Sequence, residues 1–157
     1  MTVVDLFQVI RRNEKDIFYS GIDKADINQV NEDGQNLLHE SVASNNLEFS
    51  NELIKRKIDI NHKDLNSQTP LHYVAYHKTL EIAELILIYG ASLAIEDNYG
   101  NQPLWIAVFN ARGDYEMVKT FLKFKPDVNH KNKNGKSPLD FAKQIHDQTL
   151  VNILENS

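Results

Sequence analysis

The six histidines are the side chains best suited to metal binding or acid–base chemistry in this chain, and their spacing limits what they can do. They are His39, His62, His72, His77, His130 and His146. Two metal ligands on one helix face need an H-x-x-x-H or H-E-x-x-H spacing, which does not occur here. The chain also lacks cysteine, which excludes disulfides and thiolate metal sites. We therefore expect no metal and no other cofactor.

The hydroxyl and carboxyl side chains are equally poor candidates for catalysis. A serine or threonine nucleophile needs a base within reach and a third group that orients this base. Ser41, Ser44, Ser50 and Thr69 have no such neighbours in the sequence, and the carboxylates are scattered through expected turns and solvent-facing positions. No G-x-x-x-x-G-K-[ST] phosphate loop is present. We predict that the chain has no catalytic residue and is not an enzyme.

Two of the histidines belong to a tetrapeptide that recurs along the chain. Its copies are Asn36–His39, Thr69–His72, Gln102–Trp105 and Ser137–Asp140. The third residue of each copy is a leucine, and these leucines, at positions 38, 71, 104 and 139, are separated by 33, 33 and 35 residues. A period in this range indicates stacked helical units.

This pattern resembles the ankyrin repeat, whose signature is Thr-Pro-Leu-His followed by a helix of small residues. The Gly90-Ala91 pair and the Asp-x-Asn segments at 26–28, 59–61 and 127–129 belong to the same signature, so the resemblance covers essentially the whole chain. It implies an all-α repeat solenoid, in which stacked helix–turn–helix repeats are joined by β-hairpin-like loops. It also implies that His39 and His72 hydrogen-bond the backbone and brace neighbouring turns.

The repeat period divides the chain into units of one ankyrin repeat domain, residues 1–157. Residues 1–29 form a degenerate N-terminal cap of two short helices, with Thr2 and Asp5 as candidate helix starts. The units that follow are repeats at 30–62, 63–95 and 96–130 and a C-terminal capping repeat at 131–157. The third repeat has two extra residues between its helices, near Arg112. Lys57 stands where the next repeat has glycine, and a left-handed conformation there costs about 1–2 kcal/mol.

Charge and hydropathy exclude several partners. The net charge of -5 argues against binding to nucleic acid or acidic membranes, because these need clustered Lys and Arg. No apolar run reaches the roughly 18 residues that span a bilayer, and Asp5 stands where a secretory signal is basic. We therefore expect a cytoplasmic protein that is monomeric by itself and binds neither nucleic acid nor membrane.

Protein binding remains, and the resemblance implies where it occurs. In ankyrin proteins the turn tips and the exposed side of the inner helices form one concave surface. The candidate protein-binding residues on this surface are Glu32, Asp33, Leu65, Asn66, Gln68, Tyr76, His77, Asn98, Tyr99, Asn101, Trp105, Phe109, Asn110, Arg112 and Lys133.

Four of these candidates, Leu65, Tyr76, Tyr99 and Phe109, are large apolar or aromatic side chains at positions expected to face solvent. Such anchors near the middle of a surface are typical of binding hot spots. Alternatively, Tyr76 and Phe109 cover gaps between inner helices. Trp105 replaces the bracing histidine, and it either packs as a core substitute or emerges at the groove.

The charges on this surface separate along the chain. Acidic residues, Glu32, Asp33 and Glu40, lie at one end, and Lys131, Lys133 and Lys136 lie at the other. Such a gradient would orient a partner and speed its encounter more than it would tighten the complex.

The resulting functional hypothesis is a protein-binding module that acts by occupying the surface of one partner. The segment 97–113 also resembles small bacterial ankyrin proteins, among which immunity proteins that neutralise a cognate toxin are found. We therefore predict a bacterial immunity protein or inhibitor that binds a toxin domain on its concave face. The alternative is a regulatory adaptor, or a host-directed ankyrin effector, that bridges proteins without inhibiting an enzyme.

Overall fold

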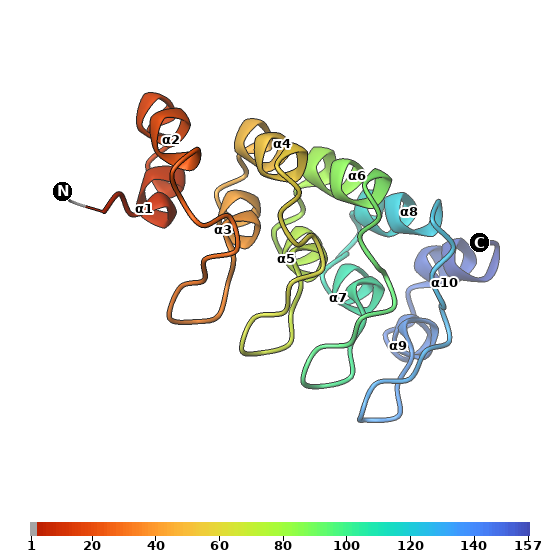
Figure 1. The fold of residues 1–157 in the computed structure, drawn as a ribbon. Helices are drawn as coiled ribbons and strands as arrows, with labels where there is room; N and C mark the ends of the chain where they lie inside the picture. Colours follow the sequence, from red (N-terminus) through yellow and green to blue (C-terminus); the bar gives the residue numbers. More distant parts are fainter. Residues whose placement is uncertain (1–2) are drawn as a thin grey trace.

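A row of paired helices forms the protein in a computed structural model that describes residues 3–157 (Figure 1). The five pairs are α1 (Leu6–Arg11) with α2 (Lys15–Ile22), α3 (Leu37–Ala43) with α4 (Leu47–Lys55), α5 (Pro70–His77) with α6 (Leu80–Ile88), α7 (Pro103–Phe109) with α8 (Glu116–Leu122), and α9 (Pro138–Gln144) with α10 (Gln148–Glu155). Asp5 caps α1, as predicted, by accepting from the N–H groups of Phe7 and Gln8. Thr2 lies outside the described residues.

The pairs stack into two layers. The inner layer contains α1, α3, α5, α7 and α9, each packed on the next, while α4, α6 and α8 pack successively in the outer layer. Among residues 3–157 the only bridge of β type is an isolated antiparallel one between Val30 and Asn36. The predicted all-α repeat solenoid is therefore confirmed.

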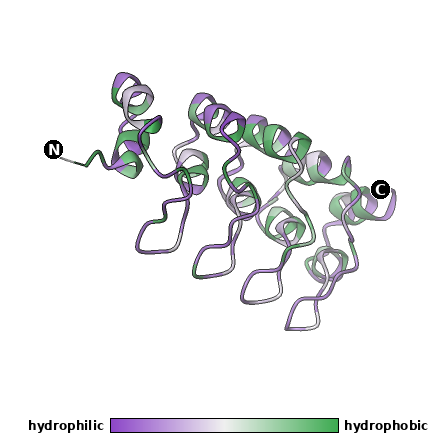
Figure 2. Cartoon of the chain, viewed as in Figure 1, coloured by the Kyte–Doolittle hydropathy of each residue, from purple (hydrophilic) through white to green (hydrophobic). Residues whose placement is uncertain are grey.

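The core lies between the two layers, where the apolar faces of the helices meet (Figure 2). The outer helices bury a stripe at spacing i, i+3, i+4, such as Ala83, Ile86 and Leu87 on α6. In the first two units Phe18 and Phe49 stack with their ring centroids 4.0 Å apart. Three inner helices start with proline at their first turn, where its missing N–H leaves no unpaired acceptor.

Hairpins precede α3, α5, α7 and α9 and project from the inner layer (Figure 1). The four are built alike: an Asn or Asp side-chain oxygen accepts from the N–H groups two and four residues later. These residues are Asn31, Asp64, Asp97 and Asn132. The third residue after this Asn or Asp has a left-handed backbone conformation in every hairpin. These residues are Gly34, Ser67, Gly100 and Gly135. This repeated local chemistry sets the hairpin shape.

One backbone hydrogen bond links each hairpin to the next. The N–H groups of Leu65, Asn98 and Lys133 donate to the carbonyls of Asp33, Asn66 and Tyr99, respectively, each at 3.0 Å. The first residue of each pair occupies the same position in its hairpin. The hairpins therefore form a continuous hydrogen-bonded row.

The bracing role predicted for His39 and His72 is confirmed. The Nδ1 atom of His39 accepts from the Asn36 N–H at 3.2 Å, and its Nε2 contacts the Gln68 carbonyl of the next hairpin at 3.0 Å. His72 makes the same contact with the Asn101 carbonyl at 3.0 Å. Burial lowers the pKa of His39 from its usual 6.5 to about 4, and it lowers the pKa of His72 as well.

The turn near Arg112 differs from the other helix–helix turns. Arg112 and Gly113 have φ values of 47° and 89°, and the turn spans residues 110–115, whereas the turn between α5 and α6 spans residues 78–79. The Lys78 ammonium, from the preceding unit, lies 3.7 Å from the Asp114 carboxylate and 3.4 Å from the Ala111 carbonyl oxygen. The longer turn is thereby tied to its neighbour.

Two further observations complete the fold. Lys57 has a φ of 62°, which confirms the left-handed conformation predicted there. No helix within residues 3–157 combines the length and apolar character required to cross a membrane.

Candidate protein-binding surface

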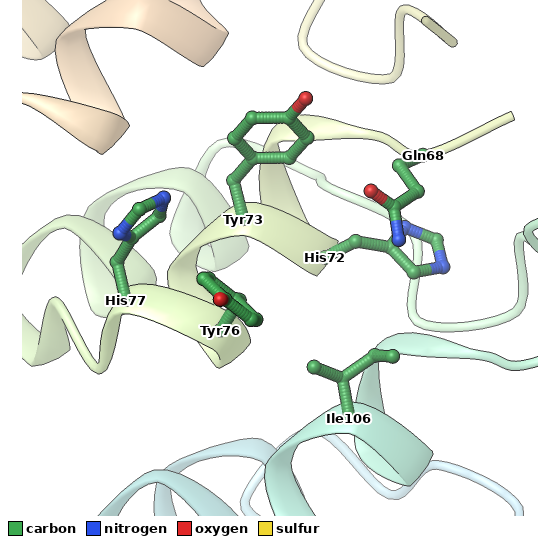
Figure 3. Close-up of a pocket in the computed structure, with 6 residues that line it drawn as sticks. All are labelled: Gln68, His72, Tyr73, Tyr76, His77 and Ile106. Atoms are coloured by element: carbon green, nitrogen blue, oxygen red, sulfur yellow. The ribbon is translucent and has the colours of Figure 1, made fainter. Parts of the chain in front are cut away.

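A groove of about 260 Å³ opens on the exposed side of the inner helices, which together with the hairpins we call the inner face. Its lining residues are Gln68, His72, Tyr73, Tyr76, His77 and Ile106. Ile106 comes from α7, and the others come from α5 and the turn before it (Figure 3). Sequence reasoning had placed Gln68, Tyr76 and His77 here, and the structure brings these three together.

The polar groups of the groove are held in their neutral forms. The Tyr73 hydroxyl donates to Asp64 at 2.8 Å and accepts from the Gln35 amide at 2.6 Å. Burial and this contact with Asp64 raise the pKa of Tyr73 above its usual value of 10.0. Burial lowers the pKa of His77, whose ring meets the Tyr76 ring edge-on at 5.1 Å. At neutral pH the groove thus offers aromatic and aliphatic surface without a net charge.

An aromatic cluster extends this surface from α7 to α9. The Phe141 ring lies 5.4 Å from Trp105 and 5.3 Å from Phe109, measured between ring centroids. Trp105 is half-buried, so it packs against the next helix and still reaches the inner face. Phe109 covers part of the gap between α7 and α9, yet half of it, 50%, stays exposed. Contact of either residue with a partner remains a prediction.

The other large candidates stand free of the core. Tyr76 is 67% exposed on α5, while Leu65 and Tyr99 are 71% and 68% exposed at the tips of their hairpins. Asn66, beside Leu65, is also exposed. The positions are therefore solvent-facing, as the sequence predicted.

Several polar candidates already serve the scaffold. The Asn98 amide donates to the Leu65 carbonyl at 3.2 Å, and Lys133 Nζ donates to the Asn98 carbonyl at 2.8 Å. The Asn101 side-chain oxygen accepts from the Asn132 amide at 2.8 Å. These side chains would have to exchange a hydrogen bond within the protein for one with a partner.

The two candidates at the end of α7 lie apart from the groove. Asn110 is the half-buried C-terminal cap of this helix, and Arg112 is exposed in the longer turn that follows. Neither residue lines the groove.

The predicted acidic end is smaller than expected. Glu32 and Asp33 are exposed, but Glu40 is only 6% exposed and its carboxylate lies 2.7 Å from the Arg11 guanidinium. The assignment of Glu40 to a free acidic surface was wrong, because α1 packs on α3 and supplies this cation. At the opposite end, Lys131, Lys133 and Lys136 are exposed, as predicted.

Comparisons with known proteins agree with this architecture. Residues 6–97 and 39–132 match a family model described as "Ankyrin repeats (3 copies)". The chain belongs to the ankyrin repeat family. Ankyrin repeat domains are typically non-catalytic and bind protein partners, so this chain is a protein-binding module. Among residues 3–157, no group of three or more His, Asp or Glu side chains is placed to hold a metal ion.

Two of the ankyrin relatives illustrate the range of proteins that share this domain. The chain is 28% identical over 130 residues to Inversin of Canis lupus familiaris and 30% identical over 133 residues to Rabankyrin-5 of Homo sapiens. The alignments cover 81% and 77% of this chain but only 12% and 11% of the two relatives. The likeness therefore concerns the ankyrin repeats alone.

The residues that sequence reasoning missed share one position of the ankyrin repeat. Tyr73, Ile106 and Phe141 each directly follow the recurring tetrapeptide, and the corresponding residue of the first repeat is Glu40. In the structure this position turns toward the inner face, where Tyr73 and Ile106 line the groove. Comparing this position across the repeats would have revealed that three of the four inner helices carry an apolar or aromatic side chain here.

Proposed function

We propose that this ankyrin domain, over residues 1–157, acts as a cytoplasmic monomer without catalysis of its own. It binds one protein partner on the inner face and acts by covering the partner's surface. The observation that carries this proposal is the apolar strip across α5, α7 and α9. It runs from Tyr76 past Ile106 to the aromatic cluster of Trp105, Phe109 and Phe141.

The chemistry of the strip suits a specific complex. A standard interface buries about 800 Å² on each partner, and nanomolar affinity requires about -12 kcal/mol. Aromatic side chains at the centre of an interface supply most of such an energy when a partner excludes water from them. The exposed Leu65 and Tyr99 extend the contact to the hairpin tips.

We further propose that the partner is a toxin domain and that the protein is a bacterial immunity protein or inhibitor. A stack of packed helices that covers an active site or substrate groove blocks access to it without chemistry. The net charge of -5 favours encounter with a basic partner such as a nuclease. Support for this role comes from the resemblance of segment 97–113 to small bacterial ankyrin proteins and from the charge of the chain, because Inversin and Rabankyrin-5 are mammalian proteins. The alternative is an adaptor or host-directed effector that leaves the partner active.

A matched pair of variants tests the binding surface. Tyr76→Ala combined with Phe109→Ala removes the exposed aromatic groups of the strip. Tyr89→Ala removes a comparably exposed tyrosine, 54% exposed, from the end of the outer helix α6. Affinity for a purified partner should fall in the first variant and persist in the second. Loss of binding in Tyr89→Ala alone would place the interface on the outer layer instead.

The activity of the bound partner separates the inhibitor from the adaptor. An immunity protein should form a one-to-one complex, abolish the partner's enzymatic activity and restore growth of cells that express the toxin. The Tyr76→Ala/Phe109→Ala variant should lose protection in proportion to its loss of affinity. A stable complex in which the partner retains full activity would instead identify an adaptor.

A further inference from the structure

A second groove, of about 590 Å³, lies at the N-terminal end of the protein, away from the apolar strip. One wall is the segment that enters α1, with Val3 and Val4, and the other is the first hairpin, with Val30. Val3 and Val30 are 96% and 49% exposed. The groove therefore presents apolar side chains to solvent between a helix and a hairpin.

The hydrogen-bonded row of hairpins continues to the edge of this groove. In three hairpins the same position donates its N–H to the carbonyl of the preceding hairpin, at Leu65, Asn98 and Lys133. The corresponding residue of the first hairpin is Glu32. Its N–H group meets no acceptor in the part of the chain that the structure describes. A backbone carbonyl placed in the groove would complete the pattern.

The groove also carries a net negative charge. Its lining contains the carboxylates of Asp5, Glu32 and Asp33, whereas its cation, Arg11, already pairs with Glu40 at 2.7 Å. Within residues 3–157 neither Glu32 nor Asp33 takes part in an ion pair. An occupant with Lys or Arg side chains would find both carboxylates available.

We propose that this groove binds a basic β-turn loop of a protein partner. A carbonyl of the loop accepts the Glu32 N–H, as the Asp33 carbonyl accepts the Leu65 N–H within the chain. Its apolar atoms cover Val4 and Val30, and its cations pair with Glu32 and Asp33. This surface is distinct from the apolar strip and adds a second contact to the proposed function.

A second copy of the chain is a poorer occupant, although its last hairpin has suitable chemistry. That hairpin carries Lys131, Lys133 and Lys136, and the Asn134 carbonyl accepts no hydrogen bond within residues 3–157. However, each hairpin leads directly into an inner helix, and this hairpin leads into α9. A hairpin placed in the groove would therefore bring its inner helix next to α3. In the groove, the α9 of the second copy would occupy the space of α1. A loop that carries no such helix avoids this clash.

A cyclic peptide provides the probe. The sequence Lys-Asn-Lys-Asn-Gly-Lys, which forms the turn at residues 131–136 of this chain, is flanked by two cysteines that close the peptide through a disulfide. This peptide is titrated into the ¹⁵N-labelled protein, and binding is followed by NMR. The Glu32 amide proton should shift downfield and exchange more slowly with solvent, together with shifts at Val30 and Phe7. A control peptide with glutamate in place of lysine should produce none of these changes.

Two charge-reversal variants complete the test. Glu32→Lys should weaken peptide binding by roughly tenfold at low salt, and added salt should shrink the difference. Glu81→Lys, an exposed change of the same charge on α6, should bind as the unaltered protein does. Tyr76→Ala/Phe109→Ala should also bind the peptide normally, which separates this site from the apolar strip that carries the proposed function.

Three results would overturn the proposal. The first is an unshifted Glu32 amide at millimolar peptide, and the second is equal binding of the basic and acidic peptides. The third is self-association of the unaltered protein, by analytical ultracentrifugation, that Glu32→Lys abolishes, because a second copy would then be the occupant.

Discussion

Acidification should destabilise the protein through its buried bracing histidines before its carboxylates are protonated. The ring of His39 is fully buried, and burial lowers its pKa from 6.5 to about 4. Its Nδ1 accepts from the Asn36 N–H, so a proton added there would break the contact that fixes the turn. The folded state therefore disfavours the charged form of this histidine.

The sign and size of the effect follow from linkage. Because the pKa is lower in the folded state, the unfolded chain binds more protons between pH 6.5 and 4, and stability falls as the pH falls through this window. From these two pKa values, His39 alone should reduce the free energy of unfolding by about 2 kcal/mol between pH 7 and pH 5. His72 adds a contribution of the same sign, because burial lowers its pKa too.

Urea unfolding at a series of pH values measures this effect. His39→Gln should be less stable than the unaltered protein at pH 7, because it loses the brace, but its stability should depend less on pH. His146→Asn, at an exposed left-handed position after α9, serves as the control and should keep the original dependence. If His39→Gln retains the full slope between pH 7 and pH 5, the buried histidine is not its source.

Further predictions concern the surface, the core and the hairpins. Tyr76→Ala and Phe109→Ala should each cost about 2 kcal/mol or more in partner affinity, measured by calorimetry, with little change in melting temperature. Phe49→Ala should destabilise the first two units by about 3–5 kcal/mol in urea unfolding, because it leaves a cavity beneath its stacked neighbour. Gly100→Ala and Gly135→Ala each place a side chain at positive φ, which costs about 1–2 kcal/mol. Gly100→Ala should lower the melting temperature more, because its Cβ would lie 2.9 Å from a backbone nitrogen of the next hairpin, whereas the space at Gly135 is open.

The fold was predictable because its signals are local and repeated. Proline at the first helical turn and the Asn or Asp that starts each hairpin act within a few residues of their own position, and so does the Nδ1 atom of the tetrapeptide histidine. These signals can therefore be recognised in a single sequence, and the repeat period indicates which units stack on one another. The left-handed conformation of Lys57 was also predictable, because Lys57 stands where the next repeat has glycine.

The surface was less predictable because it depends on contacts between units. The chain position that carries Tyr73 and Ile106 in the groove carries Glu40 one repeat earlier, where Arg11 of α1 neutralises it. Nothing near Glu40 in the sequence indicates this pairing, since the two residues are 29 positions apart. The sequence also left open whether Trp105 packs in the core or faces the groove, because its packing depends on Phe141 of the next unit.

Trp105 also determines which unit of the protein should unfold locally first. At the junctions before it, His39 and His72 tie one unit to the hairpin of the next, but within residues 3–157 the Trp105 side chain makes no such hydrogen bond to the Lys136 carbonyl. In a solenoid each unit is stabilised by its immediate neighbours alone, so a weaker junction separates two cooperative segments. The last unit, α9 with α10, should accordingly open first in native-state hydrogen exchange. A partner that clamps Trp105 and Phe141 together would suppress this opening and couple recognition to the rigidity of the C-terminal unit.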